Sequence, residues 1–578
     1  MAYELPKLAT IERWFLRAGI FVLPLAFGWG AFDEYVMPKL VVARALVLGL
    51  LMLFGARTAF SGKVVIKRTP LDLPLVALVA SAVLSTALAE NQNVAVFGTY
   101  SRYDGLLTLV TYAGLFWLSV QTLKSADDAR GLLRVLLATA YAVAVIAILQ
   151  AVRNSLRAGG FDAAYGTMGN PNVLGAFLAT AFALGLGELA LARSAAGRIL
   201  TINVLVVVGL ALLMSFSRSG WLGAGLGAAI VIAGSLRRAP LVSMAAALGG
   251  ILAALLALTF VAGRGLGGGF DLPRQLIRRG LTVLDMNAWG SSRLHIWADS
   301  VNLVASRPLT GYGPDSFGLV YPRFESGDWG VTSTGSHEQI DKAHAETLQV
   351  AATQGLIGLA AYLWLLFAFG RAFWAGRRHP GAVGVFAAFV AYQSTIQLNF
   401  TALASAFPFW ILVAAAVWVF GAATPSRVVV VPWRAPLRAA SAALFVALAA
   451  LFLPAVVYPY IAEAELRAAI DANSLARPAD ARADAELARS FAPQESVYAV
   501  EAANLADEAH ESDAAREAYL EAIRLGTYNP FVYMNLALVD LELGRRDEAL
   551  SAALGALALN RFDPAFQALV AQIESTAP

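Results

Sequence analysis

The stretch VLVVVGLALLMSFSRSGWLGAGLGAAIVIAG, residues 204–234, indicates the fold class of this protein. Two apolar runs flank the short polar segment SFSRSG, residues 215–220. Each run approaches the roughly 20 residues that an α-helix needs to cross the hydrocarbon layer of a membrane. The pattern therefore predicts two antiparallel membrane helices, with Arg218 in the tight turn between them.

The composition extends this interpretation to most of the 578 residues. Hydrophobic residues make up 58% of the chain and charged residues only 14%, whereas soluble globular domains carry about 25% charged residues. The mean hydropathy is +0.63. These values exclude a string of soluble domains and predict an all-α, polytopic membrane bundle of about 12 to 13 helices. The absence of cysteine excludes disulfides, thiolate catalysis and Cys-ligated metal sites.

Thirteen apolar segments are expected to form the membrane helices. The first follows Lys7, Arg13 and Arg17, and because no small-residue cleavage site comes after it, we expect an uncleaved helix rather than a signal peptide. The expected spans are 14–32, 37–56, 71–89, 105–122, 132–152, 171–192, 199–216, 219–236, 241–263, 346–370, 381–400, 404–421 and 438–460.

The distribution of Lys and Arg predicts the orientation of these helices. Basic residues concentrate in alternate loops, for example Lys67 and Arg68, Arg237 and Arg238, and Arg377. Because cytoplasmic loops carry the excess of basic residues, we expect a cytoplasmic N-terminus. An odd number of helices then places the C-terminus on the extracytoplasmic side.

Two domains are expected: a transmembrane domain at 1–460, which includes a long extracytoplasmic loop at 264–345, and a helical tail at 462–578. The tail repeats itself, since DAAREAYLEAIRLGTYNP at 513–530 aligns with DEALSAALGALALNRFDP at 547–564. The offset of 34 residues is that of tetratricopeptide repeats, which form an α-solenoid with a concave binding surface. The alternative is an alanine-rich helical hairpin that binds no partner.

The histidines offer little support for a metal site. His295, His337 and His344 belong to the long loop, but no known ligand spacing relates them. We expect no metal site, and a metal bound by His337 and His344 is the weaker alternative. Ser333 and Ser336 lie near His337, but the sequence lacks the nucleophile elbow of a serine hydrolase.

Arginines on the extracytoplasmic side are the stronger signal, because they oppose the usual charge bias of that side. The planar guanidinium of Arg218 or Arg293 suits a diphosphate, and the alternative role is contact with lipid headgroups. His344 is the best candidate for a general base, since a histidine titrates near neutral pH. The other arginines expected on this side are Arg153, Arg157, Arg264, Arg274, Arg278 and Arg279.

Four stretches resemble the O-antigen ligase and polymerase superfamily of bacterial envelope glycosyltransferases. They are GTMGNPNVLGAFLA at 166–179, SFSRSGWLGAGLG at 215–227, SRLHIWADSVNLVASRPLTGYGPDSF at 292–317 and AHAETLQVAATQGLIGLAAYLWLL at 343–366. The resemblance implies an inverting, metal-independent transferase without a cofactor, working at the outer face of the bacterial inner membrane. Its donor would be a glycan on undecaprenyl diphosphate.

The resemblance also implies roles for individual residues. Arg218 and Arg293 would bind the diphosphate, and His344 would activate the acceptor hydroxyl. Two departures matter, because Ala345 replaces the polar residue that often follows the histidine, and the plainest ligases lack the repeat tail. The residues expected to bind substrate are Arg153, Arg157, Asn172, Tyr312 and Asp315.

Several alternatives stay open at this stage. An O-antigen ligase is the first interpretation, and a repeat-unit polymerase or a protein O-oligosaccharyltransferase of the same superfamily is the second. The acceptor would be a lipid, a glycan or a protein, and residues 462–578 offer a surface for a protein partner. A transporter or flippase and a scaffold built on the tail are weaker alternatives, and no feature indicates nucleic-acid binding.

Overall fold

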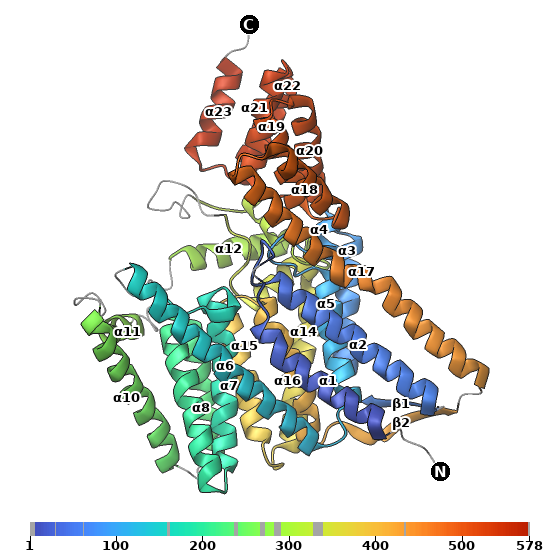
Figure 1. Cartoon of the computed structure of the whole chain (residues 1–578), viewed down its shortest axis with the longest axis vertical. Coiled ribbons are helices and arrows are strands. Elements are labelled where there is room, and N and C mark those ends of the chain that lie inside the picture. Colours follow the sequence, from blue (N-terminus) through green and yellow to red (C-terminus); the bar gives the residue numbers. More distant parts are fainter. Residues whose placement is uncertain are drawn as a thin grey trace.

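The computed structural model confirms the expected fold class, an all-α polytopic bundle with a helical tail (Figure 1). The tail stands on one end of the bundle, which we call the tail end, and the loops that precede α3, α6 and α17 lie toward the other. The structure describes residues 6–28, 30–61, 63–158, 162–235, 241–265, 272–281, 291–327, 339–432 and 435–575.

Each expected membrane span overlaps one helix. By length and composition, six of the described helices are apolar enough to cross a membrane, and five further apolar helices are shorter. The helices that match the expected spans are α1 (Pro6–Leu25), α2 (Met37–Ser61), α3 (Asp72–Ala87), α5 (Leu106–Thr122), α6 (Ala126–Ala158), α7 (Pro171–Leu191), α8 (Ala195–Met214), α9 (Arg218–Ser235), α10 (Leu241–Gly265), α14 (Glu346–Gly376), α15 (Ala382–Gln397), α16 (Leu403–Val419) and α17 (Ala435–Ser474).

The centre of the bundle is held by close packing of α7, α9 and α15. A Cβ added at Gly220 of α9 would lie 3.0 Å from the backbone of Gly175 in α7. Gly187 of α7 meets Gly384 of α15 in the same way, backbone against backbone. Small residues allow this approach, and in a membrane such van der Waals contact is a main source of helix association. The packing fixes the start of α9, where Arg218 lies.

A two-stranded sheet connects the helices at the end opposite the tail (Figure 1). Strand β1 (Lys63–Arg68) pairs antiparallel with β2 (Thr424–Pro432), with Val65 opposite Val430. The sequence analysis places both segments between membrane helices and predicts no strand for either of them. Each segment is rich in valine, which favours strands, but the partners are more than 350 residues apart in sequence.

The long loop contains short helices rather than only irregular chain. It includes α11 (Leu272–Leu281), α12 (Ser291–Ser306), α13 (Phe317–Val320) and η2 (Tyr321–Arg323). A further short helix, α4 (Gln92–Phe97), lies between α3 and α5, and η1 (Gly166–Met168) precedes α7. Of these elements, α4, α11 and α12 lie toward the tail end of the bundle (Figure 1).

The tail consists of helical hairpins with the expected period. Helices α19, α21 and α23 begin at Ser496, Pro530 and Pro564, which are 34 residues apart. Helices α18, α20 and α22 begin at 478, 512 and 546, with the same spacing. Alanines fill most of the interfaces between these helices, since small side chains let paired helices approach. The ranges are α18 (Pro478–Phe491), α19 (Ser496–Glu508), α20 (Ser512–Leu525), α21 (Pro530–Glu542), α22 (Arg546–Leu559) and α23 (Pro564–Ser575).

The tail is attached to the bundle through Glu463, a buried residue of α17. Its Oε2 accepts hydrogen bonds from the Asp33 backbone N–H at 2.6 Å and from the Tyr100 hydroxyl at 3.1 Å. Its Oε1 accepts a hydrogen bond from the hydroxyl of Tyr498 in α19 at 3.0 Å. One carboxylate therefore joins two bundle loops to the first repeat.

Candidate active site

His344 lies at the tail end of the bundle, two residues before α14. Its backbone is left-handed, with φ of 50°, a conformation that is uncommon for residues other than glycine and often marks functional sites. The ring packs edge-on against Phe400, with centroids 5.5 Å apart. Among the described residues, its buried Nδ1 and the buried Oδ1 of Asn399 meet no full hydrogen-bond geometry, but the Asn399 side chain lies close enough to act on the imidazole and raise its pKa. A buried imidazole nitrogen in this state can accept a proton from a ligand hydroxyl.

Arg293 of α12 lies next to this histidine. Its Nη1 donates a hydrogen bond to the Leu398 carbonyl at 2.8 Å, directly before Asn399 in the chain. Arg279 of α11 donates from Nε to the Phe216 carbonyl at 3.4 Å, in the turn that leads to Arg218. The structure therefore brings Arg218, Arg293 and His344 into one region.

The charges in this region influence one another. Burial lowers the pKa of Arg293 to about 10, and the positive charges of Arg218 and Arg279 add to this effect. Burial also lowers the pKa of His344 to about 4, with Arg293 as the next largest cause. At pH 7 the site therefore combines clustered guanidinium groups with a neutral imidazole. Arg218 also opens α9, whose N-terminal dipole favours anions.

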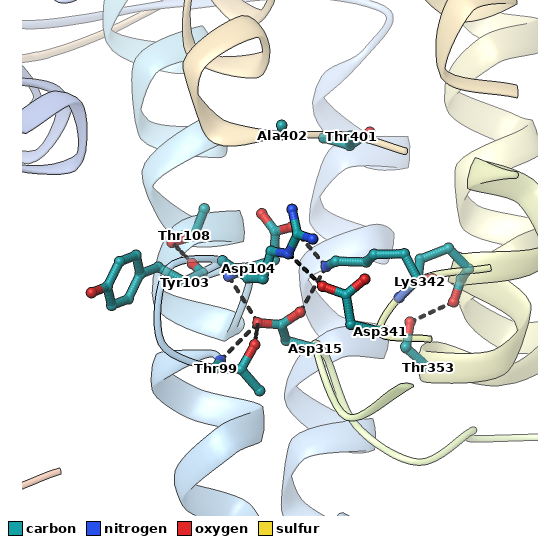
Figure 2. Close-up of polar contacts among 12 residues, drawn as sticks. Thr99, Tyr103, Asp104, Thr108, Asp315, Asp341, Lys342, Thr353, Thr401 and Ala402 are labelled. Carbon is teal, nitrogen blue, oxygen red and sulfur yellow. Dashed lines mark hydrogen bonds and ion pairs between the residues drawn. The ribbon is translucent and has the colours of Figure 1, made fainter. Parts of the chain in front are cut away.

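A buried ion cluster holds the segment before His344 (Figure 2). The Lys342 ammonium contacts Asp104 Oδ2 at 2.8 Å and Asp315 Oδ1 at 2.7 Å. Asp315 Oδ2 accepts a hydrogen bond from the Thr99 backbone N–H at 2.8 Å. Burial raises the pKa of Asp104 to about 6, although Lys342 opposes this change. The cluster ties together the loop before α5, the loop after α12 and the segment before α14.

Arg102 is a site residue that the sequence analysis missed. Its Nε donates to Asp341 Oδ2 at 2.6 Å, and its guanidinium carbon lies 5.0 Å from the centre of the Phe400 ring. Its charge contributes to the lowered pKa of His344. The sequence signal is SRYDG at 101–105, which carries Arg102 and Asp104 in one short loop, but their partners are more than 200 residues away.

A break in α14 joins two of the four stretches that carry the resemblance to the ligase and polymerase superfamily. Gly355 has φ of 68° and interrupts the helix, which any other residue would adopt only with strain. The freed Leu356 N–H donates to the Pro308 carbonyl at 2.7 Å, and the Gly313 N–H donates to the Thr353 carbonyl at 2.8 Å. The RPLTGYGPDSF segment is thereby paired with α14, which positions Asp315 beside Lys342.

Tyr312 and Asp315 have partners inside the protein. The Tyr312 hydroxyl and Ser306 Oγ lie 2.9 Å apart, and the Tyr312 residue is only 8% exposed. Asp315 belongs to the ion cluster described above. Roles for these two residues in sugar binding stay predictions.

The other expected substrate-binding residues lie on α6 and α7. Arg153 and Arg157 are exposed on the last turns of α6. Asn172 is half-buried in the first turn of α7, and its backbone N–H donates to the capping Asn170 Oδ1 at 2.8 Å. Their contact with substrate is likewise a prediction.

Some expected residues are exposed or lie outside the described part of the chain. His295 on α12 and Arg278 on α11 are exposed. Residues 328–338 lie outside the described part of the chain, and so the weaker alternatives involving His337, Ser333 and Ser336 do too. The side chains of Arg264 and Arg274 also lie outside it.

The tail covers the loops that form the site. The Tyr528 carbonyl, between α20 and α21, accepts a hydrogen bond from Gln339 Nε2. A Cβ at Gly318 would lie 3.3 Å from both the Tyr528 ring and Asp341 Cα, so Tyr528 packs close to the partner of Arg102. On the other side, Asn93 donates to the carbonyls of Gln494 and Leu525 at 2.8 and 2.9 Å.

A family model described as O-antigen ligase matches residues 203–363. The matched range contains Arg218, Arg293 and His344, and it agrees with the resemblance noted in the sequence. This similarity supports a membrane glycosyltransferase of the ligase or polymerase type. No curated protein matches the chain in sequence. Among solved structures, the APC/C hetero-tetramer Cut9-Hcn1 is similar at 12% identity over 80% of this chain and 90% of that chain, but its TM-score of 0.19 carries no argument.

Proposed function

We propose that the protein moves a glycan from undecaprenyl diphosphate to an acceptor at the outer face of the bacterial inner membrane, as an O-antigen ligase does. One observation carries the proposal: Arg218, Arg293 and His344 meet in one region although they come from separate helices and loops. All three residues fall inside the range that matches the O-antigen ligase family model.

In this mechanism the arginines hold the donor diphosphate. Negative charge accumulates on the diphosphate as its bond to the sugar breaks, so Arg218 and Arg293 stabilise the transition state more than the ground state. Loss of one such charge-stabilising donor typically lowers the rate by about 10²–10³. The third guanidinium, on Arg279, lies near enough to add to the same positive field.

His344 takes the proton of the acceptor hydroxyl. The acceptor oxygen attacks the anomeric carbon, and the electron pair of the broken bond leaves with the diphosphate, which inverts the configuration. General-base assistance contributes roughly 10²–10⁴ in rate. Because the positive charge of Arg293 lowers the pKa of His344 in the empty site, a bound diphosphate raises that pKa and makes the imidazole a better base. The proposal assigns no role to a metal.

A transfer assay tests these roles. The purified full chain is incubated with an undecaprenyl-diphosphate-linked glycan, an acceptor and EDTA. We expect wild-type transfer to survive EDTA, and Arg218→Ala, Arg293→Ala and His344→Ala to lose at least 100-fold. The matched controls are Arg371→Ala and His379→Ala, exposed residues at or beyond the far end of α14. Full activity in all three site variants would exclude the assignment.

The same assay identifies the acceptor class. A lipid acceptor that gains mass supports the ligase, a lengthened lipid-linked glycan supports a repeat-unit polymerase, and a glycosylated protein supports a protein O-oligosaccharyltransferase. The last outcome would make residues 462–578 the expected docking surface for the target protein.

The proposed orientation has an independent test, because the chain contains no cysteine. Ala476→Cys places one thiol on the exposed start of the tail, and Ser125→Cys places one in an exposed loop before α6. We expect a membrane-impermeant maleimide to label only the first in spheroplasts, and both after permeabilisation. Labelling of position 125 alone in spheroplasts would reverse the orientation.

A further inference from the structure

A cavity of about 90 Å³ lies beside His344. Its wall includes Asp104, Asp315 and Lys342 from the ion cluster, together with Glu346 and Phe400. His344 is adjacent, since its ring packs on Phe400 and it lies two residues from both Lys342 and Glu346. By the volume that one water needs, the cavity has room for about six waters, or for the hydroxyl-bearing edge of one sugar ring.

One group in the cavity wall lacks a partner. Tyr112 of α5 lines the cavity and is only 6% exposed. Its hydroxyl forms no hydrogen bond to any part of the chain that the structure describes. A buried hydroxyl in this state has lost its hydrogen bonds to water without a replacement, and a ligand hydroxyl would relieve that penalty.

The charge of the cavity is opposite to that of the arginine region. Three acidic side chains, from Asp104, Asp315 and Glu346, face one basic side chain, from Lys342, so the wall carries more acidic than basic groups. This surplus disfavours phosphate and carboxylate ligands. Carboxylates accept hydrogen bonds from sugar hydroxyls and attract an ammonium group.

The loop at 398–402 separates the two regions. Its Leu398 carbonyl holds Arg293, whereas its Phe400 and Thr401 line the cavity. His344 packs on this loop, between a basic region suited to a diphosphate and an acidic cavity suited to a polyol.

We propose that the acidic cavity binds the sugar ring of the acceptor that carries the attacking hydroxyl, and that it selects neutral or amino sugars over acidic ones. The assignment to the acceptor rests on the proposed function. The binding site itself does not, because it stands on the cavity, its charge and the unpartnered Tyr112 hydroxyl.

Direct binding tests the site without any transfer activity. Saturation-transfer difference NMR is recorded on the full chain in detergent with methyl glucoside, methyl glucosaminide and methyl glucuronide. We expect the first two to bind and the glucuronide to bind at least tenfold more weakly. Equal binding of the glucuronide would overturn the charge argument.

Two single-atom variants locate the binding. Tyr112→Phe removes only the unpartnered hydroxyl, so the fold is retained and the glucoside is expected to bind about tenfold more weakly. The matched control is Tyr103→Phe, because the Tyr103 hydroxyl is also buried and unpartnered but Tyr103 does not line the cavity. Unchanged glucoside binding in Tyr112→Phe, with thermal unfolding as in wild type, would overturn the site.

The transfer assay then separates acceptor from donor. We expect Tyr112→Phe to raise the KM for the acceptor about tenfold and to leave the KM for the donor unchanged. A raised donor KM instead would place the donor sugar in the cavity and overturn the acceptor assignment. If glycosides bind but no acceptor is glycosylated, the proposed function fails while the sugar site stands.

Discussion

Lys342 forms ion pairs with two buried carboxylates, those of Asp104 and Asp315. Replacing Lys342 by methionine would remove the only cation that forms an ion pair with either of them within the described residues. Asp315 is 2% exposed and Asp104 15%, measured on the side chains, and both contact the ammonium at less than 3 Å. Methionine keeps the length of the side chain but leaves both carboxylates uncompensated. The variant therefore tests the electrostatic role of Lys342 apart from its packing.

The structure allows an estimate of the cost. Removing one partner of a buried ion pair typically destabilises a protein by about 3–5 kcal/mol. The destabilisation has an upper bound, because an unpaired buried carboxylate can bind a proton and become neutral. For a carboxyl with a reference pKa of about 3.9, binding that proton at pH 7 costs about 4 kcal/mol. Asp315 is the more deeply buried of the two carboxylates, with 2% of its side chain exposed against 15% for Asp104, so it dominates the penalty. We expect a loss of about 4 kcal/mol at pH 7.

Thermal unfolding of the full chain in detergent at pH 8 and pH 6 measures this effect. The native state of Lys342→Met has to bind a proton, so its deficit shrinks by up to about 1.4 kcal/mol for each unit that the pH falls. Asp104→Asn is the matched control, because it leaves Lys342 and Asp315 as a balanced pair and is expected to cost no more than about 1 kcal/mol. The reasoning is refuted if Lys342→Met has the same deficit at both pH values, or if Asp104→Asn is equally destabilised.

Four further predictions concern catalysis, stability and the tail. Because diphosphate binding raises the pKa of His344, the acid limb of the kcat profile should lie at a higher pH than that of kcat/KM for the donor. If the two acid limbs coincide in pH–rate profiles, the bound donor does not raise the pKa of His344. The pKa of His344 is lowered from 6.5 to about 4 in the folded state, so below pH 6.5 the unfolded chain binds a proton at His344 before the folded chain does. The free energy of unfolding therefore falls as the pH drops from 6.5 toward 4. Thermal unfolding of His344→Gln should show a smaller fall over this range, and a fall equal to that of the wild type would contradict the lowered pKa. Arg293→Lys should retain less than a tenth of transfer, since lysine lacks the fork that binds a diphosphate; wild-type rates would argue for charge alone. Glu463→Ala should make the tail sensitive to limited proteolysis, with Glu465→Ala as the control on the same helix; equal resistance would show that other contacts suffice.

The amino-acid sequence by itself determined the membrane helices and the repeats of the tail. Hydropathy and repeat spacing are local properties. An apolar run of sufficient length is stable in lipid whatever the rest of the chain does, and each helical hairpin of the tail packs on the next hairpin in the chain. The same local reading identified Arg218, Arg293 and His344 as candidates, since each belongs to a recognisable stretch.

Only the tertiary structure decided what surrounds those residues. Lys342 meets Asp104 from a loop 238 positions away, and Arg102 meets Asp341 from 239 positions away. The pairing of β1 with β2 and the attachment of the tail through Glu463 join residues that are still farther apart in sequence. Such contacts depend on which helix ends share one face of the bundle. That arrangement results from the packing of whole helices, and no short stretch of sequence records it.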